Sequence, residues 1–505
     1  MPIFVIMKRV SSLEARKGND MIYLDYNATT PIDKEVAGAM LPYLYGNFGN
    51  PSSEHALGVK AKNAIEQARG EVAGLLHAFP KEIVFTGCAS ESNNMVLKGV
   101  AHTLKEKGNH IITSKIEHPS ILEPCKYLEE IGFEVSYVSV DEYGLVDPKD
   151  IEKLMTDKTI LVSIMHSNNE TGTMQPIKEI ALICQRHQVL FHTDASQAMG
   201  KVPVDVKDLG VDFLTLAGHK LYAPKGIGAL YIKEGIQIES LLHGAGHESG
   251  RRAGTESILL EVGLGKACAI ATDAMKTSEV KFLTEYFYQR LKDNFGEGIH
   301  LNGHPELRLP NTLNISFIGF NGHEILNKLN DVAASTGSAC HSGMTSLSPV
   351  LISMGVSEEI GRGAIRFSLG RYTTKEEVDQ VMEELKNVIN GKKESGGNQM
   401  KLGIIIETKE HEKAWNAMRF AVASKKKGHE VKVFLMGEAV EIENLSNEKY
   451  DVGEQVALFH EIGGTILACG TCLKSRDMEG SEACPLSTMI DCVELVEWAD
   501  KMVTF

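Results

Sequence analysis

The chain has 505 residues, of which 43% are apolar and 24% are charged, and its formal net charge at pH 7 is −15. A chain of this length exceeds one compact core, so we expect two or three domains. The acidic balance argues against nucleic acid or an anionic membrane as the main partner. Nine cysteines, an odd number spread over the chain, favour a reducing compartment, the cytoplasm, over a disulfide framework.

Residues 1–20 begin with a short apolar run and continue with charges. They lack the basic start and the small-residue cleavage site of a signal peptide, so we expect a loose N-terminal extension. No apolar run of the sequence is long enough to cross a bilayer, and no membrane partner is expected.

Between residue 35 and about residue 270, short apolar strands alternate with helical stretches; examples are EIVFTG, HIITSK, VLFHTD and DFLTLAG. Nearly continuous apolar strands separated by helices indicate a mostly parallel sheet that is covered on both faces. Residues 271–390 predict a smaller α/β unit that the amphipathic helix VDQVMEELKNVI closes.

A polar, Gly-containing stretch without periodicity predicts a flexible linker at residues 391–400. Residues 401–505 begin with the apolar strand GIIIET and predict a compact α/β domain of ordinary size. Its helices are expected at 411–427 and 487–499.

In an open parallel sheet, ligands bind beyond the carboxyl ends of the strands. After EIVFTG, Ala89 and Ser90 open a helix whose free N–H groups suit an anion, although a plain helix cap is the commoner explanation. After HIITSK, His118 precedes a helix that begins with proline, and taken alone it would be a surface histidine.

Two further strand ends carry charged residues. Asp194 ends the apolar strand VLFHT, where a buried carboxylate needs a cation, and Gln197 lies one turn further on. Lys220, with His219 beside it, follows DFLTLA; it either extends to solvent or is a desolvated amine that forms a Schiff base. Pyridoxal 5′-phosphate requires this combination, because its phosphate, its pyridinium nitrogen and its aldehyde need an anion site, a carboxylate and a lysine.

Over residues 21–390 the chain resembles the pyridoxal-phosphate-dependent cysteine desulfurases of the NifS/IscS type, in the class V aminotransferase family. The motifs that carry the resemblance are, in chain order, MIYLDYNATTP, FTGCASESNN, EHPSILEPC, MHSNNETGTMQPI, HTDASQAMGK, LAGHKLYAPKGIGALYI, HGAGHESGRRAGTES and STGSACHSG…IRFSLGRYT. The resemblance implies the type I fold of pyridoxal-phosphate-dependent transferases, with a large, mostly parallel sheet domain and a small α/β domain. It also implies a homodimer.

The resemblance implies a role for each matching residue. Lys220 would carry the cofactor, Asp194 would pair with its ring nitrogen, and His118 would stack on the ring and move protons. Arg366 would bind the substrate carboxylate, and Cys340 would attack the substrate sulfur, leaving L-alanine and a persulfide. The remaining contacts would come from Ala89, Ser90 and His219 at the phosphate, Thr255 at the phosphate in the partner subunit, and Gln197 and Asn169 on the ring-oxygen and substrate side.

Two features depart from the family pattern. Ala217 stands where a serine is usual two residues before the His-Lys pair, which removes one phosphate contact. The Ala-Cys-His-Ser run around Cys340 also resembles the selenocysteine lyase branch, so selenocysteine stays an alternative substrate to L-cysteine.

The stretch from GGTILACGTCLKSR to the end of the sequence resembles the DsrE/F-like sulfur-relay family and implies a small three-layer α/β domain. Its cysteine spacing, C-x2-C-x11-C-x7-C, allows three interpretations. A zinc site is the first interpretation. It would have only three candidate cysteine ligands, since Cys492 falls at helical spacing and is expected in the core. A redox pair is the second interpretation. A persulfide carrier that uses Cys469, with Cys472 nearby, is favoured because tethering to a persulfide generator raises the effective concentration.

We therefore expect a cysteine desulfurase that passes its persulfide from Cys340 to an acceptor thiol, with Cys469 as a candidate in the same chain. The alternatives are a selenocysteine lyase and a sulfur-relay scaffold without catalysis. The acceptor protein stays open between an iron–sulfur cluster assembly scaffold, a tRNA-modifying enzyme and another carrier; no metal site is expected. The other cysteines are expected to be small packed residues: Cys88, Cys125, Cys184 and Cys268.

Overall fold

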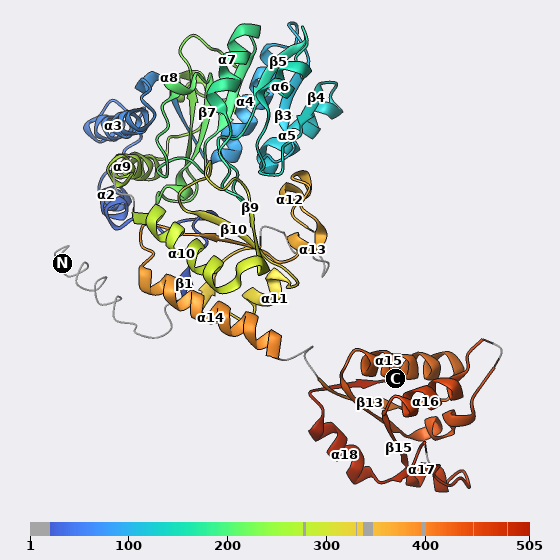
Figure 1. The fold of residues 1–505 in the computed structure, drawn as a ribbon. Coiled ribbons are helices and arrows are strands. Elements are labelled where there is room, and N and C mark those ends of the chain that lie inside the picture. Colours follow the sequence, from blue (N-terminus) through green and yellow to red (C-terminus); the bar gives the residue numbers. More distant parts are fainter. Residues whose placement is uncertain are drawn as a thin grey trace, which may run out of the picture. The chain divides into compact units, whose positions relative to one another are not determined.

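The structure, a computed structural model, describes residues 21–275, 279–329, 331–336, 347–394, 400–447, 449–481 and 483–505. The chain divides into two compact units, Met1–Leu385 and Lys386–Phe505 (Figure 1). The N-terminal extension expected at 1–20 lies outside the described residues. Helix α14 (Lys375–Glu394) continues through 391–394, so these positions of the expected linker are helical.

A seven-stranded sheet forms the centre of the first unit, in the order β2-β8-β7-β6-β5-β3-β4. Only β8 runs antiparallel to its neighbours, so the sheet is mostly parallel, as expected. Its strands are β2 (Ile83–Thr86), β3 (His110–Ser114), β4 (Glu134–Val138), β5 (Thr159–Ser163), β6 (Leu190–Asp194), β7 (Phe213–Ala217) and β8 (Gly228–Ile232).

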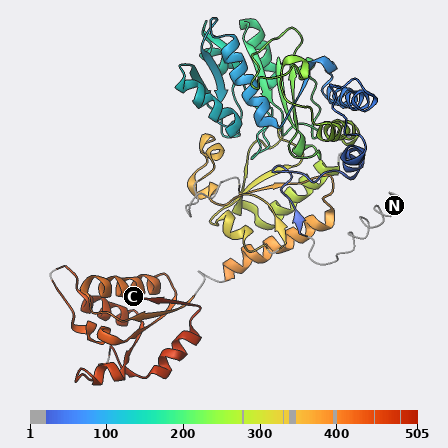
Figure 2. The ribbon, with the colours of Figure 1, turned by 180° about the vertical axis from the view of Figure 1, so that it is seen from behind.

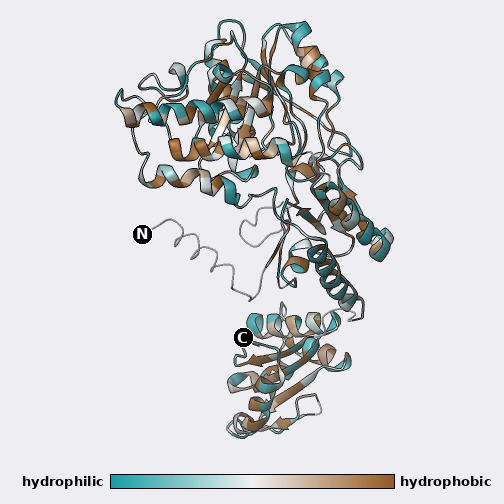
Figure 3. Ribbon diagram, turned by 90° about the vertical axis from the view of Figure 1, so that its left-hand side faces the viewer, coloured by the Kyte–Doolittle hydropathy of each residue, from teal (hydrophilic) through white to brown (hydrophobic). Residues whose placement is uncertain are grey.

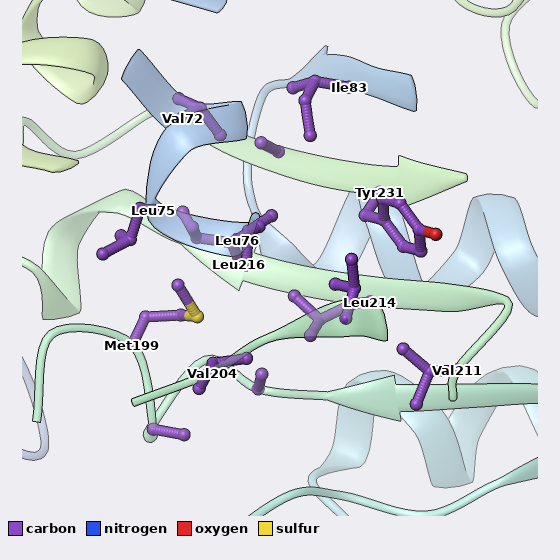
Figure 4. Close-up of a cluster of buried hydrophobic side chains, with 14 of the residues drawn as sticks. Val72, Leu75, Leu76, Ile83, Met199, Val204, Val211, Leu214, Leu216 and Tyr231 are labelled. Carbon is purple, nitrogen blue, oxygen red and sulfur yellow. The ribbon is translucent and has the colours of Figure 1, made fainter. Parts of the chain in front are cut away.

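Helices cover both faces of this sheet, and side chains alternate between two cores along each strand. On β7, Leu214 and Leu216 belong to the same core cluster as Val72 and Leu76 of α3 (Ala56–Leu76) (Figure 4). Phe213 belongs to the opposite core, beneath α4 (Ala89–Thr103). The strands are accordingly rich in apolar residues, while the helices show polar outer faces (Figure 3). The other covering helices are α5 (Pro119–Glu130), α7 (Ile177–His187) and α9 (Ile258–Ala274).

The small domain is built on the antiparallel sheet β12-β10-β9. Helix α10 packs on it, with the rings of Phe287 and Phe367 edge to face at 5.2 Å. Strand β1 (Ile22–Tyr23) pairs with β11 (Val332–Ala333), so the segment after residue 21 joins the small domain although it precedes the large one. The remaining elements are β9 (Ile299–Asn302), β10 (Thr312–Phe317), β12 (Ala364–Ser368) and α10 (Glu279–Phe295).

The second unit contains a five-stranded parallel sheet in the order β16-β15-β14-β13-β17. Helices α15 (His411–Lys426) and α16 (Val452–Glu461) lie on one face and α18 (Met489–Trp498) on the other (Figures 1 and 2). The expected helices at 411–427 and 487–499 are therefore present. The strands are β13 (Lys401–Ile406), β14 (Glu430–Leu435), β15 (Thr465–Cys469), β16 (Leu486–Ser487) and β17 (Lys501–Thr504).

Within the described part of the chain, no helix combines the length and the apolar character needed to span a membrane.

Candidate active site

A cavity of about 250 Å³ lies at the carboxyl ends of β3, β6 and β7. It gathers eight of the residues that the sequence singled out from positions far apart in the chain. They are Ala89, Ser90, His118, Asn169, Asp194, Gln197, His219 and Lys220. Because parallel strands share one carboxyl edge, the polar residues that follow them converge there.

Lys220 ends the short helix η3 (Gly218–Lys220) that follows β7. Its Nζ donates a hydrogen bond to the main-chain oxygen of Asn27 at 2.6 Å. Burial, together with the Arg366 charge, lowers the pKa of Lys220 to about 8. A substantial fraction of this lysine is therefore a neutral amine near pH 8, which is the form that condenses with a carbonyl.

Asp194 is buried at the end of β6. Its Oδ2 accepts a hydrogen bond from Asn93 Nδ2 at 2.8 Å, and its Oδ1 accepts one from the Ser196 N–H at 2.9 Å. Both of these donors are neutral. A buried carboxylate held by neutral groups suits a cationic ring nitrogen, which would supply the opposite charge.

His118 caps helix α5 and its ring is exposed to the cavity. Its Nδ1 accepts from the Ser120 N–H at 3.1 Å and lies 2.8 Å from Ser120 Oγ, which itself accepts from Asn93 Nδ2. Desolvation lowers the pKa of His118. The ring is therefore neutral near pH 7, with its proton on Nε2, and it is linked through Ser120 and Asn93 to Asp194.

The side chain of Gln197 is held by residues that the sequence analysis did not identify. Its Nε2 donates to Asn27 O at 3.0 Å, and its Oε1 accepts from Lys201 Nζ at 2.8 Å. Lys201 also donates to Asn27 Oδ1 at 2.8 Å. These bonds fix which end of the Gln197 amide is which.

Helix α4 begins beside the cavity, and its first residues Ala89 and Ser90 line it. A Cβ on Gly228 would lie 2.8 Å from the Cys88 carbonyl carbon, so glycine lets this helix start close against β8. Free N–H groups in the first turn of a helix of this length suit a phosphate. Ala217 lines the same cavity without contributing a hydroxyl.

His219 and Cys88 complete this side of the cavity. Burial and the nearby Lys220 and Lys225 charges lower the pKa of His219 to about 4, so its ring is neutral near pH 7. The expectation that Cys88 is packed is wrong, because the residue is exposed at the start of α4. Cys125, Cys184 and Cys268 are buried, as expected.

Two hydroxyls that the sequence analysis did not identify also line the cavity. The Oγ atoms of Ser167 and Ser196 are buried and have no hydrogen-bond partner within the described part of the chain. Such orphaned groups are costly unless a ligand satisfies them. They fit a polar cofactor in this cavity.

Arg366 on β12 does not line the cavity but reaches its wall through Asn169. Its guanidinium donates to Asp25 Oδ1 at 2.7 Å and to the main-chain oxygen of Asn169 at 3.0 Å. The Nε atom is buried without a partner among the residues that the structure describes. The Nε–H is thus a donor of the guanidinium that could serve a carboxylate.

Like Arg366, the expected site residues Thr255 and Cys340 are not among the residues that line the cavity. Thr255 is exposed in the segment before α9, outside the cavity of its own chain. An ion pair between Arg252 and Glu91, 2.8 Å long, ties that segment to α4. Cys340 lies outside the described residues.

The cysteines of the second unit differ in exposure. Cys469, Cys484 and Cys492 are buried, with exposed fractions of 3%, 4% and 7%, whereas Cys472 is partly exposed. Burial of Cys492 agrees with the expected core position. Among the residues described, no group of three or more His, Cys, Asp or Glu side chains is placed to hold a metal ion, which gives no support to the zinc alternative.

Comparisons with known proteins identify the family of each unit. The model of the class-V aminotransferase family matches residues 22–381, and that of the DsrE/DsrF-like family matches residues 400–505. Cysteine desulfurase IscS of Dictyoglomus turgidum is 48% identical over 373 residues, which are 73% of this chain and 94% of that protein. Cysteine desulfurase IscS of Methanosarcina thermophila is 48% identical over 379 residues, covering 74% and 92%.

Solved structures give the same assignment. A NifS-like protein aligns with a TM-score of 0.69 at 38% identity, covering 74% of this chain and 100% of the other. The structure of SspA in complex with cysteine aligns with a TM-score of 0.64 at 39% identity, covering 70% and 100%. The chain therefore belongs to the class-V aminotransferase family, with cysteine desulfurases of the IscS type among its relatives, and carries a DsrE/DsrF-like domain at residues 400–505.

Proposed function

We propose that the protein is a pyridoxal-phosphate-dependent cysteine desulfurase, which converts L-cysteine to L-alanine and collects the sulfur as a persulfide on Cys340. The observation that carries this proposal is the single cavity that joins Lys220, Asp194, His118 and the start of α4. The names of the relatives favour cysteine over the selenocysteine alternative.

The residues of the cavity fit the cofactor. The first turn of α4, including Ser90, would hold the phosphate, Asp194 would face the ring nitrogen, and Lys220 would bind the aldehyde carbon. The unpartnered hydroxyls of Ser167 and Ser196 give the cavity further polar contacts. When bound, pyridoxal phosphate supplies an electron sink that weakens the bond between the substrate Cβ and its sulfur.

The protein's own groups manage the protons and the substrate. The lowered pKa of Lys220 keeps part of its amine neutral, and the neutral ring of His118 can donate the proton that it carries on Nε2. Arg366, already anchored by Asp25, would bind the substrate carboxylate near Asn169.

In the sulfur step, the thiolate of Cys340 attacks the substrate sulfur. The new S–S bond forms as the Cβ–S bond breaks, and protonation at Cβ yields alanine. The persulfide then passes to an acceptor thiol, and the DsrE/DsrF-like domain offers Cys469 and Cys472. The proposal includes a homodimer, in which Thr255 reaches the partner's cofactor. It also includes a reducing cytoplasmic location, which suits the eight described free cysteines.

Alanine release by the cofactor-loaded full chain tests the proposal. L-Cysteine should give alanine catalytically, and Lys220→Ala should abolish both this activity and the visible absorbance of the bound cofactor. A colourless wild-type protein that forms no alanine would instead favour the sulfur-relay scaffold without catalysis.

A further inference from the structure

Cys472 and Cys469 of the DsrE/DsrF-like domain differ in their exposure to solvent. Cys472 lies in the short helix α17 (Gly470–Lys474) and is partly exposed, whereas Cys469 at the end of β15 has an exposed fraction of 3%. A protein-bound persulfide must bring its outer sulfur into contact with the sulfur that accepts it. Cys472 is the thiol of this pair that such a donor reaches first.

A hydrogen-bond donor is fixed next to Cys472. The N–H of Gly437, the first residue of η6 (Gly437–Asn444), donates to Cys472 Sγ at 3.3 Å. Gly437 has a φ of +59°, and a Cβ there would lie 3.0 Å from the main-chain oxygen of Glu407. Both facts require glycine, so the chain brings a main-chain N–H to this sulfur where other residues would be strained.

A cation is held on the same side of the helix. Arg476 donates to the main-chain oxygen of Cys472 at 3.2 Å and to Glu441 Oε1 at 2.9 Å. The other oxygen of Glu441 accepts from Lys409 at 2.9 Å. The guanidinium is therefore fixed near Cys472, where positive charge favours a thiolate or persulfide anion.

Cys469 is the N-cap residue of α17, three positions before Cys472. Desolvation and a hydrogen bond with the Cys469 thiol raise the pKa of Cys472 above its ordinary value, and the Gly437 N–H and Arg476 offset only part of this rise. The two sulfurs are thus close enough to exchange a proton. Cys484 is outside this pair: burial raises the pKa of its thiol to about 12, which keeps it protonated.

Building on the proposed function, we infer that Cys472 receives the sulfur in this domain and that Cys469 stores it. The thiolate of Cys472 attacks the outer sulfur of the incoming persulfide; a new S–S bond forms, the old one breaks, and the donor leaves as a thiolate. The thiolate of Cys469 then attacks the outer sulfur of the Cys472 persulfide. That sulfur moves to Cys469, Cys472 leaves as a thiolate, and it takes the proton that Cys469 gave up.

No oxidant or reductant is consumed in either exchange. The second exchange protects the sulfur, because Cys469 is buried and its persulfide is shielded from small thiols. A persulfide left on Cys472 would stay open to them.

The test uses the full chain carrying Cys340→Ser, so that the sulfur source is chosen by the experimenter. Glutathione persulfide is the donor, and mass spectrometry locates the added sulfur, about 32 Da per atom. With both cysteines present, the sulfur should be found on Cys469. Cys472→Ser should lower the rate of Cys469 loading at least tenfold, because the accessible acceptor is lost.

Cys469→Ser provides the second arm. The sulfur should remain on Cys472, and cyanide should remove it as thiocyanate at least five times faster than from the protein with both cysteines, since the thiol is exposed. Cys484→Ala is the matched control, because it removes a cysteine outside the pair, and it should leave loading unchanged. Melting curves establish that each variant is folded.

Two outcomes overturn the inference. Loading of Cys469 at an unchanged rate in Cys472→Ser would remove the receiving role of Cys472. Release of sulfide with formation of a Cys469–Cys472 disulfide would show that the pair reduces the persulfide and does not store its sulfur. A parallel incubation of the protein that retains Cys340 with L-cysteine, followed by alanine analysis, tests the desulfurase proposal separately, so failure of one is not failure of the other.

Discussion

The amine of Lys220 donates a hydrogen bond to the main-chain oxygen of Asn27, 193 positions earlier in the chain, at 2.6 Å. The side-chain oxygen of Asn27 accepts a second hydrogen bond, from Lys201 Nζ at 2.8 Å. Asn27 therefore joins two lysines, and its own N–H is held by Ser368 Oγ on β12 at 2.9 Å. The segment between β1 and α2 (Lys34–Tyr45) thus carries a hydrogen-bond acceptor from the small domain to the reactive lysine.

Lys201 should act as a positioning residue. Lys201→Met removes the donor that Asn27 Oδ1 and Gln197 Oε1 share, leaving buried oxygens with fewer partners. We expect a loss of about 1–3 kcal/mol in the free energy of unfolding, measured in urea on the cofactor-free chain. We also expect a displaced pH midpoint for the absorbance of the bound cofactor. Lys178→Met, an exposed lysine, is the control; equal behaviour of the two variants would contradict the role of Lys201.

The pKa of Lys220 sets how fast the cofactor binds. Because burial lowers this pKa from 10.5 to about 8, the neutral amine that attacks the aldehyde becomes more abundant at lower pH than for an ordinary lysine. The rate at which the cofactor-free chain takes up pyridoxal phosphate should rise about tenfold between pH 6 and pH 7, since the neutral fraction does so. It should level off above about pH 8. A rate that still climbs between pH 9 and pH 10 would show an unshifted lysine.

Asp194 should be essential for activity, because it is a buried carboxylate whose hydrogen-bond donors are neutral and which would pair with the cationic ring of the cofactor. Asp194→Asn keeps the shape but removes the charge, and we expect alanine formation to fall about a hundredfold or more, with weaker cofactor binding. Asp212→Asn is a matched control. Asp212 directly precedes the neighbouring strand β7, and its carboxylate accepts from the Phe191 N–H at 3.0 Å and pairs with Lys233. The claim fails if both variants lose activity to the same degree.

Glu117 should make stability depend on pH. It is buried next to His118, where burial raises its pKa to about 8, and it accepts from Ser114 Oγ at 2.6 Å and from the Met165 N–H. The folded chain keeps its proton between pH 4.5 and pH 8 while the unfolded chain loses it, so wild-type stability falls through this window. Between pH 5.5 and pH 7.5, Glu117→Gln should gain about 2–3 kcal/mol relative to wild type in urea unfolding. A pH-independent difference would mean that the carboxyl is not shifted.

Much of the site followed from the sequence for a topological reason. Ala89, His118, Asp194 and Lys220 each follow a strand, and strands of a parallel sheet end at one edge, so their convergence in one cavity could be expected. The family motifs added residues whose position the strand argument does not give, such as Asn169 and Arg366.

What the sequence left out has physical causes as well. Asn27 binds Lys220 from a segment that follows β1, and β1 pairs with β11 more than 300 positions later. No local sequence pattern predicts that pairing. The hydroxyls of Ser167 and Ser196 become informative only when their burial without a partner is known. Cysteine spacing likewise did not show that Cys472 is accessible and Cys469 is covered, because strand ends and helix turns look alike in a short stretch of sequence.

The central claim is that sulfur leaves L-cysteine and arrives on Cys340. The most direct measurement is a single turnover of the cofactor-loaded full chain, with alanine quantified and the Cys340 peptide weighed after alkylation. We predict one alanine formed per persulfide first found on Cys340, and no alanine beyond background from Cys340→Ser in the absence of added thiols. Alanine formed at the wild-type rate by Cys340→Ser, with sulfide released directly, would contradict the claim.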